Sequence, residues 1–127
     1  MSKVIYAATP FRMQYLRDKI CNFIESKGNF PLHPLLALPY ERFNYERHNR
    51  ETIYRVCFGL VDLSNELWIF GIGTGSLEEW KHAKGKPRYS FVKQFDPNWE
   101  EYIQKEKYNI KYKEILEEIL LPNNLSK

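Results

Sequence analysis

Residues 67–76 read LWIFGIGTGS, four apolar residues followed by a turn that holds three glycines. The apolar run has the length of a strand and no polar alternation, which is typical of a strand buried on both faces of a parallel sheet. The glycines relieve steric limits on the backbone of the turn, and a helix is predicted from Ser76 to about Lys84. This part of the chain therefore predicts one strand–turn–helix unit of an α/β fold.

The N-terminal residues repeat this pattern. Residues 3–8 predict another buried strand, because they are apolar, β-branched or aromatic almost throughout. Thr9-Pro10 then predicts the cap and first-turn proline of a helix, and Gly28 predicts its C-terminal cap. A short second strand is expected at residues 29–32, where nearby prolines limit its length.

The rest of the chain continues the alternation of strands and helices. A polar connector is expected at residues 41–50, and residues 87–95 predict a fourth strand with Tyr89, Phe91 and Val92 as core candidates. Asp96-Pro97 predicts another capped helix start, followed by helical sequence as far as Leu120. A helix is predicted to begin at Glu51, and its apolar face is formed by Ile53, Val56, Cys57, Leu60 and Val61.

Alternating strands and helices predict a parallel sheet joined by right-handed crossovers. We expect one domain over residues 1–127, with 121–127 as a frayed tail. Its predicted fold is a small doubly wound α/β domain, flavodoxin- or Rossmann-like, with a sheet of about four to five strands and flanking helices. The apolar stripe through Ile115, Leu116 and Ile119 has two interpretations, packing on its own sheet or a dimer contact.

The composition excludes several classes of protein. With 43% hydrophobic residues the chain is globular, and its net charge of +3 without a Lys/Arg run argues against a nucleic-acid partner. No stretch approaches the ~20 apolar residues of a membrane span, so we expect no membrane partner. Cys21 and Cys57 are expected to be buried thiols in a reducing compartment, which predicts a cytoplasmic protein.

Three loops should converge at the carboxyl ends of the strands, where doubly wound sheets bind ligands. They are residues 8–11, 33–39 and 71–76. The helix after the third loop offers unpaired N–H groups to an anionic ligand. The candidate binding residues in these loops are Thr9, Pro10, Phe11, His33, Gly71, Gly73, Thr74, Gly75 and Ser76.

Individual side chains suggest more specific contacts. Phe11 is a candidate for stacking on a base, whereas Tyr6 is expected in the core. His33 has two open interpretations, a ligand contact or a packed, hydrogen-bonded histidine. Among the arginines of the connector, Arg50 is the candidate for a phosphate contact. The three histidines have no metal-binding spacing, so no metal is expected. We also expect no cofactor.

Glu79 is the candidate catalytic residue, and it also has two interpretations. Ser76 and Glu79 have the spacing of a capping box, in which Glu79 would bond back to the first turn of its own helix. Alternatively, Glu79 extends over the cleft as a carboxylate that the helix dipole keeps ionised, ready to attack an electrophilic sugar carbon. Glu78 points about 100° away around the helix, so the two are not expected to share a role.

Several motifs together resemble the nucleoside 2-deoxyribosyltransferase-like superfamily. They are VIYAATPF at 4–11, FPLHPLL at 30–36, NELWIFG at 65–71 and GSLEEWKHA at 75–83, followed by Gly85-Lys86-Pro87. The family's nucleophile lies four residues before an alanine, a spacing that Glu79 and Ala83 meet. The resemblance therefore implies attack by Glu79 at C1′ of a nucleoside or nucleotide, without a cofactor, in a homo-oligomer.

The sequence also departs from the family's pattern. The transferases carry acidic residues before the third strand and in the loop after it. Here Cys57 and Phe58 stand where a carboxylate is expected, and residues 71–75 include no acid. Two alternatives therefore remain beside transfer or hydrolysis of an N-glycosidic bond. One is a nucleotide-binding or signalling module without turnover, and the other is an NAD-cleaving enzyme.

Overall fold

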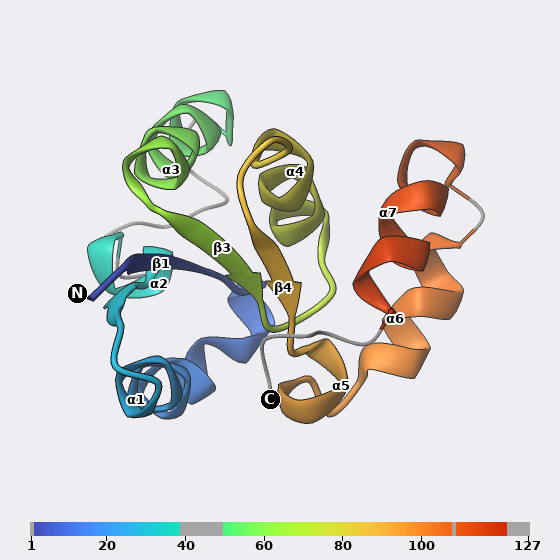
Figure 1. The fold of residues 1–127 in the computed structure, drawn as a ribbon. Helices are drawn as coiled ribbons and strands as arrows, with labels where there is room; N and C mark the ends of the chain where they lie inside the picture. The colour runs from blue at the N-terminus through green and yellow to red at the C-terminus, as the bar shows by residue number, and fades with distance from the viewer. Residues whose placement is uncertain (1, 39–49, 108, 122–127) are drawn as a thin grey trace.

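A four-stranded parallel sheet with helices on both faces forms the body of the protein (Figure 1). The computed structural model describes residues 2–38, 50–107 and 109–121. The strands follow the order β2-β1-β3-β4 and span Val4–Ala8 (β1), Phe30–Leu32 (β2), Glu66–Ile69 (β3) and Arg88–Ser90 (β4). The α-helices span Arg17–Ser26 (α1), Pro34–Ala37 (α2), Arg50–Leu63 (α3), Thr74–His82 (α4), Val92–Phe95 (α5), Trp99–Glu106 (α6) and Lys113–Ile119 (α7). Two 3-10 helices span Phe11–Leu16 (η1) and Ile110–Tyr112 (η2). The predicted small doubly wound α/β fold is confirmed.

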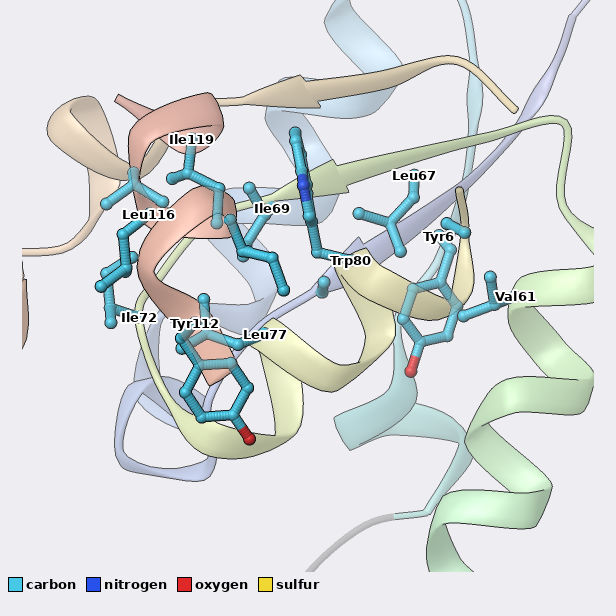
Figure 2. Packing of buried hydrophobic residues seen from close by; sticks show 14 residues of the cluster. Tyr6, Val61, Leu67, Ile69, Ile72, Leu77, Trp80, Tyr112, Leu116 and Ile119 are labelled. Atoms are coloured by element: carbon cyan, nitrogen blue, oxygen red, sulfur yellow. The ribbon is translucent and has the colours of Figure 1, made fainter. Parts of the chain in front are cut away.

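The sequences of the two central strands lack polar alternation because helices cover both faces of the sheet. Along each strand, the side chains alternate between these two faces. Tyr6, Leu67 and Ile69 face α3, α4 and α7 and pack with Val61, Leu77, Trp80, Ile115, Leu116 and Ile119 (Figure 2). On the other face, Ile5, Ala7, Trp68 and Phe70 pack with Ile20 and Ile24 of α1. The stripe at residues 115–119 thus packs within its own domain.

The fourth strand is shorter than predicted. Strand β4 ends at Ser90, and residues 92–95 form the helical turn α5. The backbone N–H of Phe91 still donates to the carbonyl of Ile69, at 2.8 Å. Beyond Ile69 the neighbouring chain leaves the sheet, so the next residues must satisfy their hydrogen bonds locally, and Asp96 N donates to Val92 O. Phe91 and Val92 are nevertheless buried, as expected.

Both predicted cap-plus-proline helix starts are wrong in detail. The Thr9 hydroxyl donates to the carbonyl of Ala7 instead of capping a helix, and the chain continues as η1 before regular α-helix begins at Arg17. Asp96 does not cap α6, whose N-cap is Asn98. Its carboxylate is instead buried against the guanidinium of Arg12, a contact between residues that are 84 positions apart.

Smaller expectations met mixed outcomes. Val56 was expected on the apolar face of its helix, but 42% of it is exposed. Cys57 is buried as predicted, whereas Cys21 is only partly buried. The connector predicted at 41–50 lies outside the described residues except for Arg50, and most of the predicted tail, 122–127, does too. In the described part of the chain, no helix combines the length and apolarity needed to cross a membrane.

Candidate functional site

A cavity of about 310 Å³ lies at the carboxyl ends of β1, β2 and β3. This is where a doubly wound sheet is expected to bind a ligand. Its walls come from the turn after β1, the start of α2, one side of α3, and the turn that leads into α4. The lining residues are Thr9, Pro10, Phe11, Pro34, Leu35, Arg50, Ile53, Tyr54, Cys57, Gly73, Thr74, Gly75, Ser76 and Glu79. The predicted convergence of three loops is present.

Glu79 lies in the wall of this cavity and does not cap its own helix. Helix α4 begins at Thr74 with Gly73 as N-cap, and no side chain caps it. The Ser76 hydroxyl donates backwards, to the carbonyls of Gly71 and Gly73 at 2.8 and 3.0 Å. The capping-box interpretation is therefore wrong, because the N-cap of the helix is Gly73, three residues before Ser76.

A donor from another element holds the Glu79 carboxyl. The Tyr6 hydroxyl of β1 donates to its Oε2 at 2.6 Å, and Cys57 of α3 lines the same cavity. Figure 2 shows the Tyr6 hydroxyl pointing between α3 and α4. Tyr6 is a core residue, as expected, but it is also the polar contact beneath the candidate catalytic group.

Burial determines the protonation of Glu79. Only 5% of the residue is exposed. This burial raises the pKa of its carboxyl to about 7, while the hydrogen bond from Tyr6 acts in the opposite direction. Desolvation thus opposes the ionisation that was expected from the helix dipole. Near neutral pH the Glu79 carboxyl is therefore ionised in part of the molecules and protonated in the rest.

Glu78 serves a separate, structural purpose. Its Oε2 accepts from the Tyr112 hydroxyl at 2.6 Å and from the Lys111 ammonium at 2.7 Å. Both partners belong to η2, on the side of α4 away from the cavity, and Glu78 is absent from the cavity lining. The two neighbouring glutamates thus have different partners, and of the two only Glu79 lines the cavity.

The glycines of the turn allow close packing of the chain, whereas the sequence predicted that they relieve steric limits on the backbone. Positive φ values among the described residues occur at Gly28 and Gly85, not in this turn. A Cβ atom at Gly71 would collide with the Met13 sulfur and the Pro10 ring, and one at Gly73 would lie 2.8 Å from Pro10 Cβ. The glycines let the turn after β1 lie directly against the turn after β3.

Gly71→Ala should therefore destabilise the protein by about 1–3 kcal/mol, because Met13 and Pro10 are buried and must shift to admit the methyl group. Gly75→Ala is the matched control, since its nearest neighbour would be Tyr54 Cε1 at 3.9 Å, an ordinary contact. Urea denaturation of both variants measures the difference. Equal stability of the two would contradict the packing explanation.

Two predicted binding residues lie outside the cavity lining. Gly71 is buried behind it, and His33 is 3% exposed as the N-cap of α2, where its Nδ1 accepts from Leu35 N at 3.2 Å. Burial, with a contribution from Arg17, lowers the pKa of His33 to about 4, so the ring is neutral at physiological pH. Of its two interpretations, the packed, hydrogen-bonded histidine describes the structure.

Sequence reasoning missed most of the wall formed by α3. Arg50, Ile53, Tyr54 and Cys57 follow the spacing i, i+3, i+4, i+7 and face the cavity together. The sequence contains this periodicity, but its apolar residues alone indicate a neighbouring face of the helix. Tyr54 stacks on Phe58, with ring centroids 5.7 Å apart, and Phe58 stacks on His82 at 4.3 Å.

Comparison with protein-family models, curated proteins and solved structures returned no match. The resemblance to the nucleoside 2-deoxyribosyltransferase-like superfamily thus depends on the sequence motifs quoted above. Among the described residues, no group of three or more His, Cys, Asp or Glu side chains has the arrangement of a metal site. The chemistry of the cavity must be derived from its own side chains, of which Glu79 is the only acid in the described lining.

Proposed function

We propose that this protein cleaves or transfers the N-glycosidic bond of a nucleoside or nucleotide, with Glu79 as the nucleophile. One observation carries the proposal: a buried carboxyl group lines the cavity and is held by the hydroxyl of Tyr6, a residue of another element. A capping carboxylate would have its partners in its own helix. The resemblance to the deoxyribosyltransferase-like motifs names the same residue.

The chemistry follows from a carboxylate that attacks a sugar carbon. The ionised Glu79 oxygen forms a bond to C1′ while the bond from C1′ to the base nitrogen breaks, and the base leaves with that electron pair and takes a proton from solvent. Water or a second base then displaces the carboxylate from C1′. A carboxylate suits the oxocarbenium-like transition state, as in retaining glycosidases. Because ionisation is required, turnover should rise with pH through about 7.

The remaining lining residues fit a ligand with an aromatic ring and polar edges. Phe11 of η1 and Tyr54 of α3 bring aromatic rings to the wall. Aromatic rings stack on any nucleobase. Thr9, Thr74 and Ser76 add hydroxyls, and Arg50 adds a cation. A cavity of about 310 Å³ is at the small end of the range for ligand sites.

A panel of substrates tests the proposal. The protein is incubated with ribonucleosides, deoxynucleosides, their 5′-monophosphates and NAD, with and without a second free base, and chromatography measures released and exchanged bases. Base release from a nucleoside or a monophosphate supports the proposal. Release of nicotinamide alone would replace it with NAD cleavage, and release from no compound would remove the enzymatic function.

A second candidate function is nucleotide binding without turnover. The described lining holds no second acid that could protonate the leaving base, and this favours binding without turnover. Thermal stabilisation by a panel compound without base release would select this function.

The resemblance also implies a homo-oligomer, which light scattering would reveal as a mass at least twice the 15.3 kDa of the chain.

A further inference from the structure

One side of helix α3 faces away from the rest of the described domain. Figure 1 shows α3 at the outside of the fold, beside α4. Its inner side contacts α4 and β1 and supplies the cavity wall. On its outer side two apolar residues are exposed, Val56 by 42% and Leu63 by 75%. The outer side of α3 is therefore a surface on which apolar residues meet solvent.

The residues of this outer side repeat with the spacing of a coiled-coil seam. Thr52, Val56, Gly59 and Leu63 are separated by four, three and four positions, which places them along one line of the helix. A Cβ atom at Gly59 would meet nothing within 4 Å. A hollow of about 700 Å³ lies beside Thr52 and Gly59. A second helix can thus approach α3 closely at the middle of the seam.

Two charges of opposite sign, Arg55 and Asp62, lie along one edge of the seam. In an antiparallel pair with a second copy, Val56 lies level with Gly59 of that copy, and Thr52 lies level with its Leu63. This register leaves Arg55 about 3 Å along the helix axis from Asp62 of the second copy, on the same edge. The two-fold axis forms this ion pair twice, so the surface is complementary to itself.

A parallel pair lacks this complementarity. It would place Arg55 beside Leu60 of the second copy, which carries no charge and is already partly buried against its own core. The pattern of charges therefore favours the antiparallel arrangement.

We propose that α3 is the contact surface of a homodimer, in which it packs antiparallel against α3 of a second copy. The resemblance implies an oligomer but names no surface, and the stripe at residues 115–119 packs within its own domain. The contact is independent of the chemistry at Glu79, because the cavity lies on the opposite side of α3. A single pair of helices is a small interface, so the expected Kd is about 1–100 µM.

The test is sedimentation velocity over a range of protein concentrations. The wild type should change from a mass of 15.3 kDa to twice that mass as the concentration rises. Arg55→Glu and Asp62→Arg each place like charges at both symmetric positions, so each should raise Kd by about tenfold or more. Lys19→Glu is the control, because it makes a similar change of charge at an exposed residue of α1, which packs on the other face of the sheet.

A mixture of the two variants gives the sharpest result. In a mixed dimer of Arg55→Glu with Asp62→Arg, each of the two pairs again joins an acid to a base. The mixture should therefore dimerise with a Kd near that of the wild type, although each variant alone does not. If Asp62→Arg does not fold, Arg55→Glu is judged together with Leu63→Gln, which removes an exposed apolar side chain and should also raise Kd.

A wild type that keeps a mass of 15.3 kDa at every concentration up to about 1 mM overturns the proposal, since that is far above the expected Kd. A dimer whose Kd is the same in Arg55→Glu, or two folded variants that do not combine, overturns this surface. Base release is measured separately, so these failures leave the proposed function of Glu79 intact.

Discussion

Glu79→Gln should lower base release by about 10⁴-fold or more, because an amide is too weak a nucleophile to form the bond to C1′. Glutamine keeps the size of the side chain and an oxygen that accepts from Tyr6. The fold should therefore survive, and circular dichroism checks it. The measurement is chromatography of bases released at pH 8, where the wild-type carboxyl is mostly ionised.

Glu78→Gln is the matched control for this prediction. It makes the same chemical change one residue away, on a side chain that contacts Tyr112 and Lys111 outside the cavity. Turnover in Glu78→Gln should stay near that of the wild type. If Glu79→Gln retained wild-type activity, Glu79 would be excluded as the nucleophile.

The same substitution also has an expected effect on stability, whose sign follows from the raised pKa. The Glu79 carboxyl titrates near pH 7 in the folded protein and near 4.5 when unfolded. Between these values the folded state holds more protons, so wild-type stability should fall as pH rises from 4.5 to 7. Glutamine removes this loss, which amounts to at most about 3 kcal/mol.

Urea denaturation of wild type and Glu79→Gln at pH 4 and pH 8 measures this effect. Relative to the wild type, the variant should gain stability between the two pH values. A difference that does not change with pH would mean that Glu79 ionises at its ordinary pKa and that its burial has no electrostatic cost.

Asp96→Asn should destabilise the protein by about 3–5 kcal/mol, the largest loss of stability expected for a single exchange here. The Asp96 side chain is fully buried and accepts from both Arg12 Nη atoms, at 2.9 and 2.7 Å. It also accepts from Ile72 N and Asn98 N, each at 2.9 Å. Asparagine would leave the Arg12 charge without its counter-ion and turn an N–H donor toward groups that are donors themselves.

The consequences of this change should reach the site. Arg12 belongs to η1, Ile72 belongs to the turn before α4, and the Arg12 guanidinium also lies 3.6 Å from the Tyr102 ring centroid of α6. The Asp96 cluster therefore fixes the position of two turns of the cavity wall relative to each other. Loss of the cluster should weaken ligand-induced stabilisation as well as the fold.

Asp62→Asn provides the comparison for Asp96→Asn. Asp62 pairs with His82 at 2.9 Å, but its side chain is 66% exposed, so its loss should cost about 1 kcal/mol or less. Urea denaturation at pH 7 compares the two variants. The Arg12 guanidinium and the backbone donors lower the pKa of Asp96, so wild-type stability should also fall as pH drops below 3.8, and Asp96→Asn should lack that loss. Equal destabilisation by the two substitutions would contradict the importance of burial.

The sequence predicted the parts of the fold that depend on local patterns. Residues 67–70 are apolar without interruption, and they are buried in and just after β3, with side chains on both faces of the sheet. Gly28 was predicted to end a helix, and it does so with φ +81°. Strand β4 was predicted too long, because its length depends on where the neighbouring strand leaves the sheet. Periodicity within one segment carries no information about the end of another.

The location of the candidate site was also predicted from the sequence, and most of its residues were. Parallel strands bring their carboxyl ends to one edge, so the turns that contain Thr9 and Gly73 had to lie near each other. Arg50 was predicted, but the rest of the wall formed by α3 was missed, because its cavity-facing stripe mixes a cation, an aliphatic residue, an aromatic residue and a thiol. Such a mixture has no single chemical signature.

The sequence by itself determined the order of strands and helices, the parallel sheet and the edge at which the cavity forms, because each depends on local patterns or on strand direction. Only the tertiary structure decided the hydrogen-bond partner and the pKa of Glu79. Its spacing from Ser76 allowed a cap, but its hydroxyl partner is Tyr6, 73 residues away. Its pKa depends on the removal of water by the elements packed around it, which only the folded arrangement specifies.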